Sequence, residues 1–223
     1  WLWWGNKECN SFECKLNDFT YDTYGNLEST VNKSHFSKCQ SNHKYCLRLK
    51  NIFNKQGYAT QSDANYFSLK LLETHPCIAS CLAVRFPVLM VDEAQDTSSV
   101  QMKILDNLIE HGLSELMFVG DPDQAIYEWR RADPSLFNHK FVLWRSNSVE
   151  FIENWRSSQY ICDFASKISS LSETMNAVNP KLIGCQGRPE IWTYSCYKEL
   201  SQQVQRFLVK CEDNHIKNKA ILT

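Results

Sequence analysis

Two short apolar runs, each followed by acidic residues, constrain the fold of this chain more than any other feature. The run Val88–Val91 leads into Asp92 and Glu93, and the run Leu116–Val119 leads through a glycine into Asp121. Such runs are typical of strands that are buried on both faces of a parallel sheet, and the carboxyl ends of these strands commonly open on a binding site. We therefore expect the acidic residues to border a ligand site.

The segment between the two runs has the pattern of an amphipathic helix. Its apolar residues recur on one helical face, Thr97 is expected to cap its start, and the helix is expected to end near Gly112. Two apolar strands joined by a helix of about four turns form a right-handed crossover unit. The predicted fold class is therefore α/β, with a parallel sheet.

The rest of the chain is expected to continue this mixture of helices and strands. A helix is predicted at 44–55, and 62–85 is predicted to form two helices broken at Pro76. Beyond a link near 146–156, a second alternation predicts a second α/β domain. Its expected elements are a helix at 159–171, a strand at 190–194, a helix at 198–210 and a strand at 220–222.

Charge and hydropathy narrow the class of protein. The 24 basic and 25 acidic side chains nearly cancel, so a nucleic-acid contact would need a local groove. No apolar run is long enough for a membrane span, and the first residues lack the pattern of a signal peptide. We expect a soluble protein of the cytoplasm, or of the nucleus in a eukaryote, without a membrane partner. The absence of an initial Met and the apolar run at 220–223 suggest a piece of a larger protein.

The ten cysteines are spread over a long chain, so reduced thiols are the expected state. A structural zinc site is the alternative, although the spacing does not follow a familiar zinc pattern. Its candidate ligands are Cys9, Cys14, His35, Cys39, His43 and Cys46.

Adjacent carboxylates at the end of the first run suit phosphate chemistry. Of Asp92 and Glu93, one can hold Mg²⁺ while the other orients or deprotonates a water molecule. An apolar run followed by Asp-Glu is common and often only ends a strand. The longer sequence Asp-Glu-Ala-Gln-Asp at 92–96 is much more specific.

The second run leads into residues that suit a phosphate sensor and a base-stacking surface. Gln124 can sense a terminal phosphate, and Tyr127, Trp129 and Arg130 place two aromatic rings beside a guanidinium group. The alternative for both aromatic residues is packing in a core.

These segments resemble motifs II and III of the UvrD/Rep/PcrA branch of the superfamily 1 helicases. The sequence Asn-Trp-Arg-Ser at 154–157 resembles motif IV of the same family, and the similarity spans about residues 86–170. The resemblance implies RecA-like motor domains. It implies an insertion with a helical lead-in at 1–85, part of the first motor domain at 86–150, and the start of the second at 151–223.

For the nucleotide, the resemblance implies ATP and Mg²⁺ as cofactors and assigns five residues. Asp92 and Glu93 would bind magnesium and activate water, and Gln124 would couple the γ-phosphate to movement. Trp155 stands where the family has a tyrosine that stacks on adenine, and Arg156 stands where it has an arginine finger.

For the nucleic acid, the resemblance assigns Tyr127, Trp129 and Arg130 to single-stranded DNA. Arg131 replaces the glycine that is usual there, which changes the loop beside the DNA. The implied activity is that of an ATP-dependent DNA helicase or translocase, with 3′ to 5′ polarity. Its substrate would be single-stranded DNA or a duplex with a single-stranded tail, and a nuclease is a compatible partner.

A phosphate-binding loop is missing from this sequence. Such a loop needs Gly-Lys-Ser/Thr, and none of the seven glycines is followed by Lys. The later motifs of the family are also missing, so the chain alone is expected to be inactive. The alternative is a catalytically inactive remnant that binds nucleic acid or a partner, and a Gly-Lys-Ser/Thr sequence encoded upstream of Trp1 would decide between the two readings.

Overall fold

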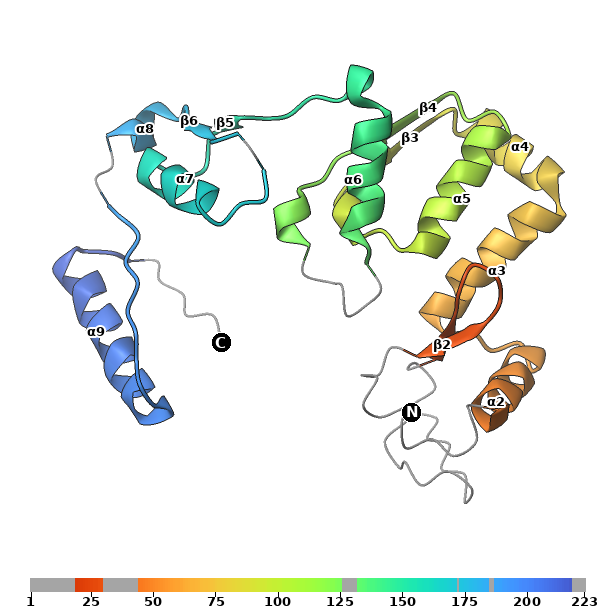
Figure 1. Cartoon of the computed structure of the whole chain (residues 1–223), viewed down its shortest axis with the longest axis horizontal. Helices are drawn as coiled ribbons and strands as arrows, with labels where there is room; N and C mark the ends of the chain where they lie inside the picture. Colours follow the sequence, from red (N-terminus) through yellow and green to blue (C-terminus); the bar gives the residue numbers. More distant parts are fainter. Residues whose placement is uncertain (1–18, 30–43, 126–131, 172, 185–186, 218–223) are drawn as a thin grey trace. The chain divides into compact units, whose positions relative to one another are not determined.

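The computed structural model describes residues 19–29, 44–125, 132–171, 173–184 and 187–217 (Figure 1). The chain divides into two compact units, Trp1–Val149 and Glu150–Thr223. The finer division of the first unit at residue 85 stays a prediction.

An antiparallel hairpin opens the described part of the first unit. Strand β1 (Phe19–Tyr21) pairs with β2 (Leu27–Ser29). The Asp22 carboxylate accepts the N–H groups of Tyr24 and Asn26 at 2.8 and 2.7 Å, which closes the turn. Gly25 has φ 90° and lies so close to α3 that a Cβ atom would be 2.5 Å from the Tyr66 hydroxyl. The turn therefore needs glycine both for its backbone and for this approach.

Three helices follow, as predicted from the sequence. They are α2 (Lys44–Lys55), α3 (Gln61–Thr74) and α4 (Pro76–Arg85). Thr60 and Asp63 form a capping box at the start of α3. Pro76 has no N–H to donate within a helix, so it ends the α3 pattern and stands at the first position of α4.

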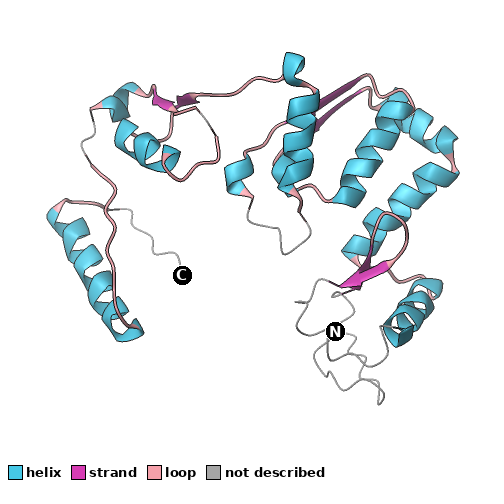
Figure 2. Cartoon of the chain, in the orientation of Figure 1, coloured by secondary structure: helices cyan, strands magenta, loops and turns pink. Residues whose placement is uncertain are grey.

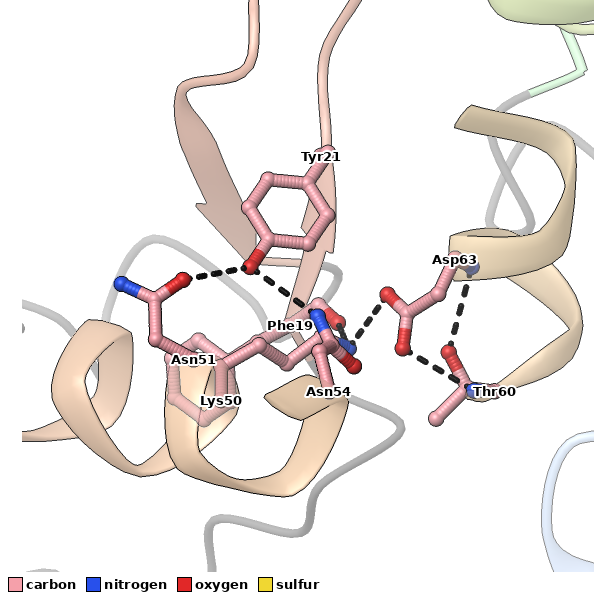
Figure 3. A network of polar contacts seen from close by, with 7 residues as sticks. All are labelled: Phe19, Tyr21, Lys50, Asn51, Asn54, Thr60 and Asp63. Carbon is pink, nitrogen blue, oxygen red and sulfur yellow. Dashed lines mark hydrogen bonds and ion pairs between the residues drawn. The ribbon is translucent and has the colours of Figure 1, made fainter. Parts of the chain in front are cut away.

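A buried ion pair joins the hairpin to α2 and α3. The Lys50 ammonium lies 2.8 Å from the Asp63 carboxylate, and both side chains are fully buried. The same ammonium donates to the Phe19 carbonyl at 2.5 Å, and the Asp63 carboxylate also accepts the Thr60 N–H at 2.9 Å (Figure 3). Burial lowers the pKa of Lys50 below its ordinary value, and the contact with Asp63 opposes that shift. The hairpin, α2 and α3 are therefore joined by an ion pair that is shielded from water.

Lys50→Met is expected to lower the free energy of unfolding by about 3 to 5 kcal/mol, because the Asp63 carboxylate would be left buried without its cation. Chemical denaturation of the chain measures this loss. Lys70→Met is the matched control: Lys70 pairs with Glu73 at 2.7 Å, but both side chains are about one third exposed, so the loss should be at most about 1 kcal/mol.

The double variant Lys50→Met/Asp63→Asn should be more stable than Lys50→Met, because a neutral amide costs less to bury than an unpaired carboxylate. Equal losses of unfolding free energy in Lys50→Met and Lys70→Met would show that the buried pair stabilises the fold no more than an exposed pair does.

The central feature of the first unit is a pair of parallel strands. Strand β3 (Val88–Val91) lies beside β4 (Glu115–Phe118) (Figure 2). Val88 is opposite Glu115, and Val91 is opposite Phe118. Helix α5 (Ser99–Glu110) connects them, as the sequence predicts. Its cap is Ser98 and not Thr97, because Ser98 forms the capping box with Gln101.

The two strands are not buried on both faces, which corrects the sequence-based expectation. Val88 and Met90 are 60% and 63% exposed, and Met117 on β4 and Val119 directly after it are also exposed. The side chains between them are half-buried, and the Phe118 ring stacks on Trp144 at 5.5 Å. Trp144 directly follows α6 (Pro134–Leu143), so one face of the pair is covered while the other is open among the described residues.

The second unit contains short elements. Strands β5 (Glu153–Asn154) and β6 (Asn176–Ala177) pair in parallel, followed by helices α8 (Pro180–Ile183) and α9 (Leu200–Asp213). Helix α7 (Gln159–Ser166) ends earlier than predicted. The expected strand at 190–194 is also wrong, since Trp192 packs its ring on the guanidinium of Arg206 in α9, at 4.4 Å, and no described strand pairs with it. The expected strand at 220–222 lies outside the described residues.

The chain is therefore a mixed α/β protein with short parallel strands. Within the described ranges, no helix has the length and apolar character to cross a membrane.

Candidate functional site

The acidic pair follows β3 directly, as predicted. Asp92 and Glu93 are both exposed, and the Asp92 carboxylate accepts the Glu93 N–H at 2.9 Å. Glu93 has a left-handed backbone, with φ 50° and ψ 43°, which is uncommon for a residue other than glycine. This conformation turns the chain from the strand into the 3-10 helix η2 (Ala94–Asp96).

Backbone hydrogen bonds join the loops beyond the two strands. The Val119 N–H donates to the Val91 carbonyl at 2.8 Å, and the Ala94 N–H donates to the Val119 carbonyl at 2.9 Å. The pairing of β3 with β4 thus continues past both strands. As a result, the acidic loop after β3 lies against the loop that begins at Gly120.

The side chain of Gln95 connects these two loops. It is only 1% exposed; its amide nitrogen donates to the Glu93 carboxylate at 2.7 Å, and its amide oxygen accepts the Asp121 N–H at 3.0 Å. Sequence reasoning included Gln95 in the 92–96 motif but gave it no role. An amide two residues after the acidic pair was the available signal, but the sequence does not show that it points inward.

Gln124 belongs to the same set of contacts. It ends the 3-10 helix η3 (Pro122–Gln124), and its amide nitrogen donates to the Asp121 carboxylate at 2.7 Å. Asp121 also accepts the Asp123 N–H at 3.0 Å, which caps this short helix. We use the name strand-end network for the residues joined in this way: Glu93, Gln95, Asp121 and Gln124.

The donor atoms at the end of β3 suit magnesium. Mg²⁺ is commonly held by one or two carboxylates, with phosphate oxygens and water completing its coordination. Asp92 and Glu93 offer exposed carboxylates, whereas no cluster of three or more potential metal ligands occurs within the described part of the chain. The zinc candidates Cys9 to Cys46 lie outside the residues and side chains that the structure describes.

The two residues predicted to contact the nucleotide from the second unit follow β5. Trp155 is 62% exposed, and its carbonyl accepts from the Asn179 side chain at 2.8 Å. The Asn154 side chain accepts the N–H of Arg156 at 2.9 Å and that of Ser157 at 2.7 Å, which fixes the backbone of this turn. Arg156 is also exposed. Its role as an arginine finger stays a prediction.

The predicted DNA-binding residues Tyr127, Trp129 and Arg130 lie outside the described residues, as does the departure at Arg131. The structure describes the chain on either side, from η3 to Ala125 and again from Ala132. Ala132 forms an antiparallel bridge with Ser98. The predicted DNA loop is thus connected directly to the end of the strand-end network.

Gly120→Ala should lower stability by about 1 to 3 kcal/mol, because there is no room for the added methyl group. A Cβ atom at Gly120 would lie 2.6 Å from the Gln95 amide oxygen and 3.1 Å from the Ala94 nitrogen. Thermal unfolding of the chain provides the measurement. The control is Gly184→Ala, where no described atom beyond the chain neighbours lies within 4 Å of the added group, and there the change should stay within about 0.5 kcal/mol.

If Gly120→Ala and Gly184→Ala unfold at the temperature of the parent, the loops beyond β3 and β4 are not closely packed.

The fold and the site define a mixed α/β protein whose parallel strands carry polar side chains at their carboxyl ends, the class in which ligands bind beyond the strand ends. The model of the UvrD/REP helicase N-terminal domain matches residues 11–141, which is more than half of the chain. The chain therefore belongs to the UvrD/REP helicase family.

Named relatives agree with this family. The chain is 37% identical over 105 residues to the exonuclease/helicase subunit RexA of Streptococcus pneumoniae serotype 4 (strain ATCC BAA-334 / TIGR4), a match that covers 45% of the chain and 8% of that protein. An ATP-dependent helicase/nuclease subunit of Streptococcus thermophilus (strain ATCC BAA-491 / LMD-9) is 37% identical over 114 residues, covering 49% of the chain and 9% of that protein. The matches thus span less than a tenth of the length of these relatives.

Proposed function

We propose that this chain is part of an ATP-dependent DNA helicase or translocase that couples ATP hydrolysis to movement on single-stranded DNA. The observation that carries the proposal is the strand-end network, in which Glu93 after one strand is connected to Gln124 after the next. The base for hydrolysis and the sensor for the terminal phosphate need such a connection if hydrolysis is to be coupled to movement. The relatives, which are named as helicase/nuclease or exonuclease/helicase proteins, support the same activity.

In the proposed mechanism, Asp92 and Glu93 have different roles. Asp92 would hold Mg²⁺, which would supply positive charge to neutralise the phosphates of ATP. Glu93 orients the attacking water and takes its proton. Its carboxylate suits this role because it is exposed and because the Gln95 amide holds one of its oxygens, which limits the orientations of the side chain.

Gln124 acts as the γ-phosphate sensor. Its position on η3 puts it two residues from the edge of the proposed DNA loop, so a change at the phosphate reaches Tyr127, Trp129 and Arg130 through a short segment of chain. The aromatic rings stack on unpaired bases, and the guanidinium contacts the DNA backbone.

Trp155 and Arg156 are the proposed nucleotide-binding residues of the second unit. The exposed Trp155 ring offers a flat face for adenine, and Arg156 is the arginine finger that stabilises charge on the transferred phosphoryl group. The Asn154 side chain supports these roles, because it fixes the backbone of the turn that carries both residues.

The proposal requires polypeptide beyond this sequence. A phosphate-binding loop has to come from elsewhere in the helicase, and the open face of the β3–β4 pair has the apolar surface that further strands or helices of a RecA-like domain would cover. The proposed domains are the insertion at 1–85, part of the first motor domain at 86–150 and the start of the second at 151–223. We also propose 3′ to 5′ polarity and a nuclease partner.

Glu93→Gln in the complete helicase is expected to slow ATP hydrolysis by about 10²- to 10⁴-fold while nucleotide binding stays nearly unchanged, because shape is kept but the base is lost. Steady-state hydrolysis and nucleotide titration measure the two effects. Glu110→Gln, an exposed acid at the end of α5, serves as the matched control and should hydrolyse ATP like the parent.

If Glu93→Gln hydrolyses ATP at the rate of the parent, Glu93 is not the base. If the parent itself shows no hydrolysis with single-stranded DNA present, the chain belongs to an inactive binding protein.

Trp129→Ala is expected to weaken binding of single-stranded DNA by about 1 to 3 kcal/mol, the range for loss of one stacking surface. Fluorescence anisotropy with a labelled oligonucleotide measures the affinity, and the unfolding midpoint should stay close to that of the parent. A large fall in the midpoint with unchanged affinity would instead assign Trp129 to a core.

A further inference from the structure

We propose that Gln95 is a positioning residue that couples Glu93 to the segment carrying Gln124, so that hydrolysis responds to DNA. The inference rests on the proposed function and adds to it the residue that connects the base with the sensor. Gln95 itself contacts neither Mg²⁺ nor nucleotide in this scheme. It acts through Glu93 on one side and through Asp121 on the other.

The orientation of the Gln95 amide is determined by its two partners. A carboxylate can only accept a hydrogen bond and a backbone N–H can only donate one. The amide nitrogen must therefore face Glu93 and the amide oxygen must face the Asp121 N–H, as the distances of 2.7 and 3.0 Å indicate. A flipped amide would oppose donor to donor and acceptor to acceptor, so only one arrangement is stable.

The surroundings of Gln95 leave it little freedom to move. The side chain is 1% exposed, and Gly120 approaches it so closely that even a methyl group would be 2.6 Å from the amide oxygen. The adjacent Ala94 is held by its backbone bond to Val119. A buried polar group in a confined position moves only together with its partners, because a lost hydrogen bond leaves it unsatisfied.

These contacts form a continuous path through polar groups. Glu93 is bonded to Gln95, Gln95 to the Asp121 backbone, and the Asp121 carboxylate to Gln124. When DNA or phosphate displaces the Gln124 segment, the Asp121 N–H moves as well. The Gln95 amide then transmits that displacement to the orientation of the Glu93 carboxylate, which is how DNA would raise the rate of hydrolysis.

A purely structural role is the competing explanation, in which Gln95 only fills space under the loops. Gln95→Met separates the two explanations, because methionine has a similar volume but no group to bond Glu93 or Asp121. The matched control is Gln101→Met, which removes the exposed amide that bonds Ser98 at 2.9 Å in the α5 cap and touches no member of the strand-end network.

The experiment measures kcat and KM for ATP in the complete helicase, with and without single-stranded oligothymidylate DNA. For Gln95→Met we expect DNA-stimulated kcat to fall by about 10- to 100-fold, the range for losing a residue that orients a reactive group, with KM within about 2-fold of the parent. Gln101→Met should keep the stimulation of the parent. In addition, hydrogen exchange at the Asp121 N–H should become faster in Gln95→Met only.

Each result decides the matter. Parent-like stimulation in a folded Gln95→Met variant overturns the coupling role while leaving the proposed function intact. If Gln95→Met does not fold, Gln95→Glu is judged by the same criteria, because it keeps the shape and the acceptor for Asp121 but, when ionised, repels Glu93 instead of donating to it. A parent without DNA-dependent hydrolysis overturns both the proposed function and this inference.

Discussion

The parallel hydrogen bonding of β3 with β4 is the constraint on which the candidate site depends. The register aligns Val91 with Phe118, and two further backbone bonds extend the pairing into the loops. The loop after β3 carries the acidic pair, and the loop after β4 carries Gln124. A change of register by one residue would exchange the two faces of a strand and separate the partners of Gln95. The register of the two strands thus sets the distances within the site.

Local signals in the sequence were sufficient to predict much of this architecture. The apolar runs gave both central strands, and the proline at 76 gave the division between α3 and α4, because a missing N–H acts on its immediate neighbours. The cap of α5 was predicted one residue too early, at Thr97, because threonine and serine are both good caps and stand side by side. The acidic pair was placed correctly at a strand end, but its chemical roles remain proposals.

Contacts between distant residues were beyond the reach of such signals. Lys50 and Asp63 look like surface residues of two helices, and only the folded chain brings them into one buried pair. The inward direction of Gln95 likewise depends on a loop 26 residues away. The apolar strand predicts burial, yet Met90 is exposed. Apolar residues favour a buried position, but they do not show which other residues cover them.

The left-handed backbone of Glu93 also limits how this position can change during evolution. Glycine, asparagine and aspartate adopt this conformation at low cost, whereas a β-branched residue such as valine is strongly disfavoured there. If the proposed hydrolysis were lost in a lineage, this position would therefore drift toward small or amide-bearing residues, and the turn beyond the strand would be kept. The backbone conformation of the loop would then be kept after its carboxylate is replaced, and a descendant with no catalytic acid would still have the same fold.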